Sequence, residues 1–281
     1  MGLLENSIRD LSVTQREFAS IRATTNQPFG VNLPVRYLQM DPKEESAIID
    51  WLLGQGIHFV TTSAGDPTRY IDQLKGAGLT VFHVVPTLKG ALKAVDAGVD
   101  GLIVEGGEGG GFKNPQDVAS MVLLPLVRSK TDVPIIAAGG MLDGRTMAAA
   151  FALGAEGIQM GTRMVSSAES PVHDNWKNAI VGAAETDTVF LNRFAKPGLR
   201  ALRTERSSRL EKEEVVNMME FGTAKDLYFG GDMEASLALG GQVMGRIESV
   251  RPVADIIRDT VEEFFEIIGS LNDSYLGQRV P

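Results

Sequence analysis

Glycines end two successive candidate strands in the middle of the chain. The stretch reads VPIIAAGGMLDGRTMAAAFALGAEGIQMGT, with Gly139–Gly140 after its first apolar run and Gly161–Thr162 after its second. Backbone N–H groups at such turns, beside the start of a helix, can hold an anion such as a phosphate. The other interpretation is that these glycines only make tight turns. The pattern alone leaves both interpretations open.

A second glycine cluster follows an earlier candidate strand. Residues 106–111 read GGEGGG, five glycines in six positions. Because glycine has no side chain, such a loop lets the backbone lie close against a flat ligand. The alternative is a floppy insertion. Asn32, at the end of another candidate strand, can both donate and accept hydrogen bonds, as the edge of a flavin or of an amide-bearing ligand requires.

Three histidines are the candidate proton carriers. His58 stands early in a strand and is predicted to be structural. His83 stands within a strand, where a place in the core is favoured over chemistry. His173 follows Pro171 and is the weak candidate for a base that faces a pocket. We expect no metal site, because the chain has no cysteine and no metal-ligand spacing of histidines and carboxylates.

Apolar runs of strand length alternate with helical segments through the first part of the chain. Runs of this kind predict parallel strands buried on both faces, as in a (β/α)8 barrel of the TIM type. Only six are counted, and the first eleven residues are expected not to form a strand. The sequence therefore predicts a barrel that lacks an N-terminal β-α-β unit. The six predicted strands are Phe29–Leu33, Ile57–Ser63, Leu79–Val85, Gly101–Glu105, Val133–Ala138 and Gly157–Met160.

The helices are predicted from caps and periodicity. Asp143 is the expected N-cap of a helix over Arg145–Leu153, which ends at Gly154. The other barrel helices are expected at Thr14–Ala23, Pro42–Leu53, Thr68–Ala77, Leu88–Ala97 and Pro115–Lys130.

After Thr162 the pattern changes. Residues 1–165, with an adjoining helix at 170–184, are predicted to form the barrel, and residues 185–281 a helical cap. Further helices are expected at Leu210–Phe221 and Arg251–Ile268, on either side of a stretch rich in glycine and methionine. Such a cap would be either a mobile lid or ordinary helical packing.

Composition limits the partners. With a net charge of -9 and a pI near 5.0, the chain is not expected to bind nucleic acid or an anionic membrane. No stretch is long and apolar enough to span a bilayer, and no signal peptide is apparent. We expect a cytoplasmic protein that acts on a small-molecule substrate, and a homo-oligomer is compatible with the sequence.

The combined motifs resemble those of the nitronate monooxygenase (2-nitropropane dioxygenase) family of FMN-bound barrels. That family is related to the FMN-dependent enoyl-acyl-carrier-protein reductases. The cap resembles that of the NADH:quinone reductase branch. The matching stretches are PFGVNL, VEGGEGGG, IIAAGGMLDGR, GAEGIQMGTRM, AESPVH and GGDMEASLALGGQVMG.

The resemblance implies an FMN site. It assigns to FMN the residues Asn32, Glu105, Gly110, Gly139, Gly140, Gln159, Met160, Gly161 and Thr162. Of these, Asn32 would hydrogen-bond the flavin. Glu105 takes a place where relatives usually have glutamine, and Gly140 with residues 159–162 would bind the phosphate and ribityl end.

Two departures bear on the reaction that this resemblance implies. The first strand of the family, which ends in Gly-Gly-Met, has no match. Phe112 stands where relatives have a histidine base, and phenylalanine cannot take a proton. We expect an FMN-dependent oxidoreductase that oxidises nitronates with O2. The alternatives are an NAD(P)H:quinone reductase, an enoyl-thioester reductase, and an inactive barrel remnant that serves as a binding subunit.

Overall fold

The computed structural model describes residues 1–5, 11–38 and 42–276. The chain divides into two compact units. The first comprises Met1–Ile103 and Lys130–Pro134, and the second Val104–Ser129 and Ile135–Pro281.

The first unit alternates strands with helices, as the sequence predicts. Strands β1 to β4 pair in order and in parallel. Its elements are β1 (Leu3–Glu5), α1 (Leu11–Thr24), β2 (Gly30–Pro34), α2 (Val35–Leu38), α3 (Pro42–Leu53), β3 (Phe59–Ser63), the 3-10 helix η1 (Pro67–Arg69), α4 (Ile71–Gly76), β4 (Thr80–Val85) and α5 (Leu88–Asp96).

The expectation that the first residues form no strand is wrong. Leu3–Glu5 is β1, and it pairs in parallel with β2 so that Glu5 lies opposite Asn32. With three residues, β1 is too short to show a periodicity. Its regular structure comes from the hydrogen-bonding edge that β2 offers.

The second unit contains the remaining elements. The strand β5 (Gly101–Glu105) runs into it. The other elements are β6 (Gly111–Lys113), α6 (Ser120–Arg128), β7 (Ile135–Ala138), α7 (Gly144–Ala152), β8 (Gly157–Gln159), α8 (Thr162–Val165), α9 (Asp174–Val181), β9 (Thr188–Leu191), β10 (Gly198–Leu202), α10 (Glu205–Leu210), the 3-10 helix η2 (Met218–Phe221), α11 (Ala224–Tyr228), the 3-10 helix η3 (Gln242–Arg246) and α12 (Val253–Tyr275).

The main sheet confirms the predicted class of fold. Its seven strands follow the order β1-β2-β3-β4-β5-β7-β8, and β7 pairs with β8 in parallel. Strands that neighbour one another in chain order, with helices between them, are the pattern of a (β/α) barrel. The sheet has seven strands instead of the six counted in the sequence because β1 adds one.

A second, antiparallel sheet was not expected. Its order is β6-β10-β9, and Leu199 of β10 lies opposite both Phe112 of β6 and Leu191 of β9. Strand β10 falls within the region that the sequence predicts as a helical cap. Residues 185–281 are therefore not helical throughout, although α12 confirms the long helix predicted at the C-terminal end.

The helix expected over Leu210–Phe221 is wrong. Helix α10 ends at Leu210, and regular structure returns only in the short η2. Two tertiary interactions hold the intervening chain. Glu211 forms an ion pair with Arg203 at 2.8 Å, and the Val216 N–H donates to the Asn192 side chain at 2.7 Å. These bonds compete with the local helical pattern.

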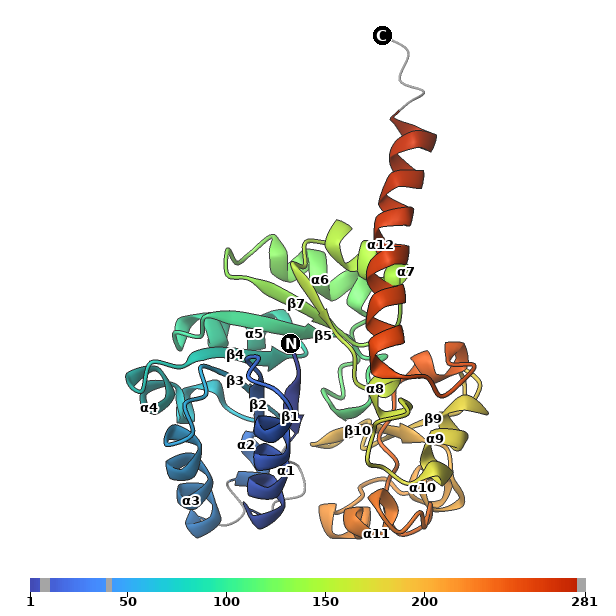
Figure 1. Ribbon diagram of the computed structural model, residues 1–281. Helices are drawn as coiled ribbons and strands as arrows, with labels where there is room; N and C mark the ends of the chain where they lie inside the picture. Colours follow the sequence, from blue (N-terminus) through green and yellow to red (C-terminus); the bar gives the residue numbers. More distant parts are fainter. Residues whose placement is uncertain (6–10, 39–41, 277–281) are drawn as a thin grey trace. The chain divides into compact units, whose positions relative to one another are not determined.

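Helix α12 packs along α7, and the two run side by side in Figure 1. The rings of Phe151 and Phe264 lie 5.1 Å apart. At the start of α7, a Cβ on Gly144 would lie 2.3 Å from the backbone nitrogen of Phe264. The close approach of the two helices therefore requires glycine at position 144. No helix in the described part of the chain is long and apolar enough to cross a membrane.

We predict that Gly144→Ala lowers the free energy of unfolding by about 1–3 kcal/mol, because the added methyl group overpacks a backbone contact. The control is Gly269→Ala within α12, where a Cβ would meet nothing within 4 Å. That change should stabilise the protein by about 0.5–1 kcal/mol. Urea denaturation measures both variants, and equal stabilities would contradict the packing argument.

His83 of β4 lies in the core of the first unit with 3% of its surface exposed. Its Nδ1 lies 2.7 Å from Thr62 Oγ1. Burial lowers the pKa of His83 from 6.5 to about 4, and the weaker influence of Asp66 opposes the shift. These contacts place the side chain in the core, as the sequence favours.

We predict that His83 makes the fold sensitive to acid. The folded protein binds this proton more weakly than the unfolded chain does. The stabilisation is therefore complete above about pH 6.5 and is lost as the pH falls toward 4. Between pH 7 and pH 5 the free energy of unfolding should fall by about 2 kcal/mol. We would measure the free energy of unfolding by urea denaturation at the two pH values. The fall of about 2 kcal/mol should be missing in His83→Gln and retained in His58→Gln, because His58 is exposed. An undiminished acid sensitivity in His83→Gln would refute the prediction.

Candidate functional site

The loop at residues 106–111 is tied to its surroundings by its own backbone. The Gly106 N–H donates to Ala138 O at 3.1 Å, and the Gly107 N–H donates to Val118 O at 2.8 Å. The positive φ of Gly139, +82°, brings its Cα close enough that a Cβ would lie 3.0 Å from Gly106 O. These contacts contradict the alternative of a floppy insertion.

Glu108 anchors the same loop to α6. Its carboxylate accepts hydrogen bonds from the Ser120 N–H at 3.2 Å and from the Ser120 hydroxyl. Val118, whose carbonyl accepts from the Gly107 N–H, lies just before the helix. Helix α6 begins at Ser120 and not at Pro115 as predicted. Arg200 of β10 adds a bond from its Nε to Gly107 O at 2.9 Å.

A third glycine segment, Gly240–Gly241, completes the arrangement. A Cβ on Gly110 would lie 2.5 Å from the carbonyl carbon of Gly240, so the two backbones approach as closely as glycine allows. The Gly241 N–H donates to Thr162 Oγ1 at 3.0 Å. The structure therefore brings together four predicted site residues, Gly110, Gly139, Gly140 and Thr162, together with Gly240 and Gly241. The latter two were not singled out, although a glycine pair in an apolar run is a signal for them.

Glu105 and Lys113 form an ion pair beneath this loop. Their Oε1 and Nζ atoms lie 2.5 Å apart, and the Lys113 side chain is only 1% exposed. A Cβ on Gly109 would lie 2.6 Å from Glu105 Oε1. The sequence identifies Glu105 but not Lys113. A lysine so deeply buried needs a carboxylate beside it, which gives a physical reason for glutamate at position 105.

The Phe112 side chain lies on the opposite face of β6 from that of Lys113. Successive side chains of a strand face opposite sides, and Lys113 faces Glu105 and Gly109. Phe112 packs instead against the apolar cluster that β9 and β10 share, which includes Leu191 and Leu199. The side chain at the position of the family's histidine is therefore a packing residue of the second sheet.

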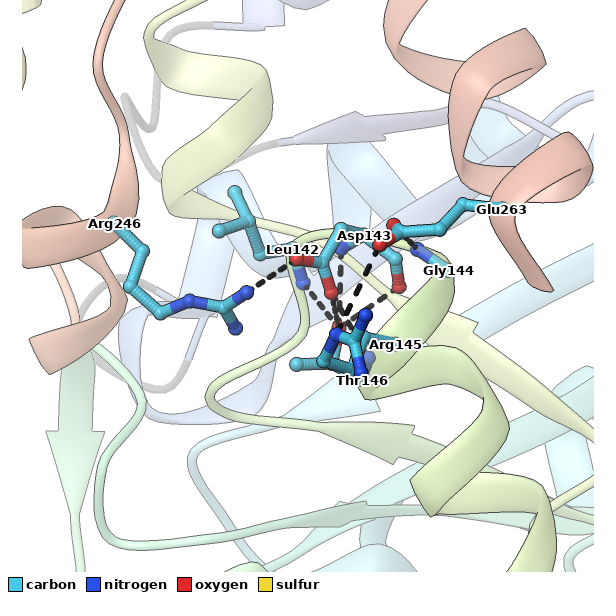
Figure 2. A network of polar contacts seen from close by, with 7 residues as sticks. All are labelled: Leu142, Asp143, Gly144, Arg145, Thr146, Arg246 and Glu263. Carbon is cyan, nitrogen blue, oxygen red and sulfur yellow. Dashed lines mark hydrogen bonds and ion pairs between the residues drawn. The ribbon is translucent and has the colours of Figure 1, made fainter. Parts of the chain in front are cut away.

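The N-terminus of α7 binds carboxylates of the chain itself (Figure 2). Asp143 caps it as predicted, in a capping box with Thr146. The Asp143 carboxylate also forms an ion pair with the Arg246 guanidinium at 2.5 Å. Glu263 of α12 accepts a hydrogen bond from the Gly144 N–H at 2.9 Å. Negative groups are favoured at this end of the helix dipole. An external anion would have to displace these carboxylates.

The turns beside α7 keep N–H groups without acceptors. Among the described residues, the backbone N–H groups of Gly140, Gly161 and Thr162 donate to no protein atom. A Cβ on Gly161 would meet nothing within 4 Å, so the space above that turn is open. An anion would find donors here and not at the start of α7. Gln159 and Met160 lead into this turn at the end of β8.

Asn32 belongs to the first unit. Its Nδ2 donates to Glu5 at 2.7 Å and its Oδ1 accepts from Thr61 at 2.9 Å. The two bonds fix the orientation of the amide. Its role toward a flavin stays a prediction.

His173 stands at the N-cap of α9. Its Nδ1 accepts a hydrogen bond from the Asn175 N–H at 3.1 Å, and its ring lies against Gly231. These are the contacts of a capping residue, and its role as a base stays a prediction. No group of three or more potential metal ligands occurs in the described part of the chain.

Comparisons with known proteins agree on one family. A family model described as nitronate monooxygenase matches residues 2–263. A CoA dehydrogenase of Rhodococcus jostii, named for a 5-hydroxy-7a-methyl-1-oxo-octahydroindene-4-carboxyl-CoA, is 33% identical over 75% of this chain and 58% of its own length. A probable nitronate monooxygenase of Staphylococcus saprophyticus is 31% identical over 63% of this chain and 52% of its own length.

The solved structures show the same fold. FabK from Thermotoga maritima superposes with a TM-score of 0.89 and 35% identity, covering 98% of this chain and 88% of that chain. A nitroalkane oxidase from Streptomyces ansochromogenes has a TM-score of 0.80, covering 96% of this chain and 90% of that chain. At 22% identity it supports the fold alone.

The parallel sheet and the glycine turns at its strand ends define an α/β protein of the barrel type. Within that class, the chain belongs to the nitronate monooxygenase family. It spans 58% of the length of the CoA dehydrogenases that it matches in Rhodococcus jostii and Mycobacterium tuberculosis.

We predict that Glu105→Gln lowers the free energy of unfolding by about 3 kcal/mol, because it leaves the Lys113 charge buried without its partner. Removing that charge as well, in Glu105→Gln/Lys113→Met, should return the stability to within about 1 kcal/mol of the parent. Denaturation by urea measures both variants. A double variant as unstable as the single one would show that the charge is not the cause.

Proposed function

We propose that this chain binds FMN and oxidises alkyl nitronates with dioxygen. The observation that supports the proposal is the group of free N–H donors at Gly140, Gly161 and Thr162, beside a loop tied to two other glycine segments. The family supplies the class of reaction. The site supplies the means of holding the cofactor.

The residues present fit FMN. A phosphate needs several donors in open space, and the turn at Gly161 offers both. The flat ring needs a backbone without side chains, which the loop at residues 106–111 provides. The Asp143 and Glu263 carboxylates at α7 keep an anion from binding there, so the phosphate is directed to the neighbouring turns.

The chain's own part in the reaction is binding and orientation. When bound, FMN supplies the redox chemistry. A nitronate is already a carbanion, so no side chain has to remove a proton from it. This agrees with Phe112, which packs into an apolar cluster and has no proton to exchange. The buried Glu105–Lys113 pair would keep this loop in position to receive the cofactor.

A second candidate is hydride transfer to or from an acyl thioester, with NAD(P)H as a co-substrate in the reductive direction. It is favoured by two relatives at 33% and 34% identity that are named CoA dehydrogenases. Hydride transfer to a quinone from NAD(P)H belongs to the same candidate, since neither reaction requires a base at position 112.

A cytoplasmic location and a homo-oligomer also stay predictions.

The test is reconstitution with FMN followed by oxygen uptake with propionate-3-nitronate. We expect a yellow protein that consumes oxygen. Gly110→Ala should bind FMN at least about tenfold more weakly, because its methyl group would push the loop away from Gly240. The control is Gly157→Ala, whose Cβ would meet only the Ile136 side chain at 3.7 Å.

Three results separate the candidates. A flavoprotein inactive with nitronates but reduced by NAD(P)H, or active on an acyl-CoA, would favour the second candidate. A protein that takes up no FMN would overturn both candidate reactions. The remaining alternative would then be an inactive barrel that serves as a binding subunit. Equal loss of FMN in both glycine variants would remove the argument from the loop.

A further inference from the structure

A hollow of about 430 Å³ lies in the second unit at the turn between β9 and β10. It is lined by two segments, Asn114, Pro115 and Gln116 after β6, and Arg193, Phe194, Ala195 and Lys196 before β10. Its volume falls in the range of small-molecule sites.

Phe194 is the first unusual feature of the hollow. Its side chain is 92% exposed, the highest value among the large apolar side chains in the described part of the chain. A single exposed apolar residue needs no explanation by itself. Here, however, the ring stands between two cations at the edge of a hollow, and every base of a nucleotide has a face that stacks on such a ring.

The two cations have no acidic partner. Within the residues that the structure describes, no carboxylate lies within ion-pair distance of Arg193 or Lys196. The nearby acids are already used, since Asp117 pairs with Arg200 and Glu211 pairs with Arg203. In a chain of net charge -9 this is a local excess of positive charge.

Arg193 is also held in position. Its Cζ lies 4.6 Å from the centre of the Phe190 ring. Its charge is close enough to Arg200 to add to the lowering of the Arg200 pKa that burial causes. A guanidinium fixed in this way can receive a phosphate with little loss of freedom.

Strand β6 connects the hollow to the glycine loop at residues 106–111, which the proposed function assigns to the flavin. Gly110 precedes this strand and Asn114 follows it, a separation of about 13 Å at 3.3 Å per residue. A co-substrate with its reactive group at one end and a phosphorylated adenosine at the other could therefore contact both places.

We propose that this hollow binds the adenosine phosphate end of the co-substrate, with the adenine on Phe194 and phosphates on Arg193 and Lys196. Asn114 and Gln116 offer amides to the edge of the base. The inference rests on the second candidate function, because NAD(P)H and coenzyme A carry this group and alkyl nitronates do not. The two sources differ in their phosphates, at the 2′ position in NADPH and at the 3′ position in coenzyme A.

The test is equilibrium dialysis of the full chain with adenosine 3′,5′-bisphosphate, adenosine 2′,5′-bisphosphate and ADP. We expect the preferred probe to bind, and Arg193→Gln/Lys196→Gln to weaken it at least about tenfold. The matched control is Arg209→Gln/Lys212→Gln, which removes two exposed cations at the same spacing. Phe194→Leu should weaken binding about tenfold while leaving the melting temperature unchanged.

The probes also identify the source. A preference for the 3′ phosphate indicates coenzyme A, and a preference for the 2′ phosphate indicates NADPH. If ADP binds as tightly as the two bisphosphates, the source is NADH. Failure of all three probes to bind, or equal weakening in the control variant, would overturn the proposal. Dialysis requires no turnover, so a protein that is inactive with nitronates can still bind the probes and support this inference. If the protein oxidises nitronates but binds none of the probes, this inference is refuted while the proposed nitronate oxidation stands.

Discussion

The contact on which the candidate site depends is the one between Gly110 and Gly240, two backbones with no side chain between them. Through it, a loop of the barrel touches a segment about 130 residues later in the chain. The neighbouring bonds from Gln242 N–H to Glu108 O and from Gly241 N–H to Thr162 Oγ1 extend the same junction. Close backbone packing with directional hydrogen bonds fixes the loop without a rigid side chain. The loop is therefore a preformed surface, as the proposed binding of a flat cofactor requires.

Charge is arranged around this junction in two different ways. The Glu105–Lys113 pair is buried, so each group depends on the other. At α7, Asp143 and Glu263 satisfy the helix N-terminus and leave the adjoining turns with free donors. The carboxylates of the chain itself thus occupy the helix N-terminus, and the donors left without acceptors are those of the adjoining turns. In the proposed function, these donors would let an acidic protein hold a phosphate without a basic surface.

Much of the barrel could be predicted from the sequence, because apolar runs and glycine-ended helices are local signals. Asp143 was identified as a cap from its position alone, and the structure shows the capping box. The elements that were missed depend on distant partners. Strand β1 needs the edge of β2, β10 needs β6 and β9, and the chain after Leu210 is held by Asn192 and Arg203. For the site, the sequence indicated Glu105 and the glycines, whereas Lys113 and the place of Phe112 follow only from the alternation of β6.

Strand β6 also limits how this architecture can be divided. It follows the glycine loop directly, yet it pairs with β10, whose other neighbour is β9. The second sheet therefore takes one strand from the barrel half of the chain and two from the C-terminal half. A recombination that exchanged only the C-terminal half between relatives would separate Phe112 from Leu199 and Lys113 from Gly198. The C-terminal half of the chain therefore depends on β6 for its own sheet, and inheritance must keep the two together.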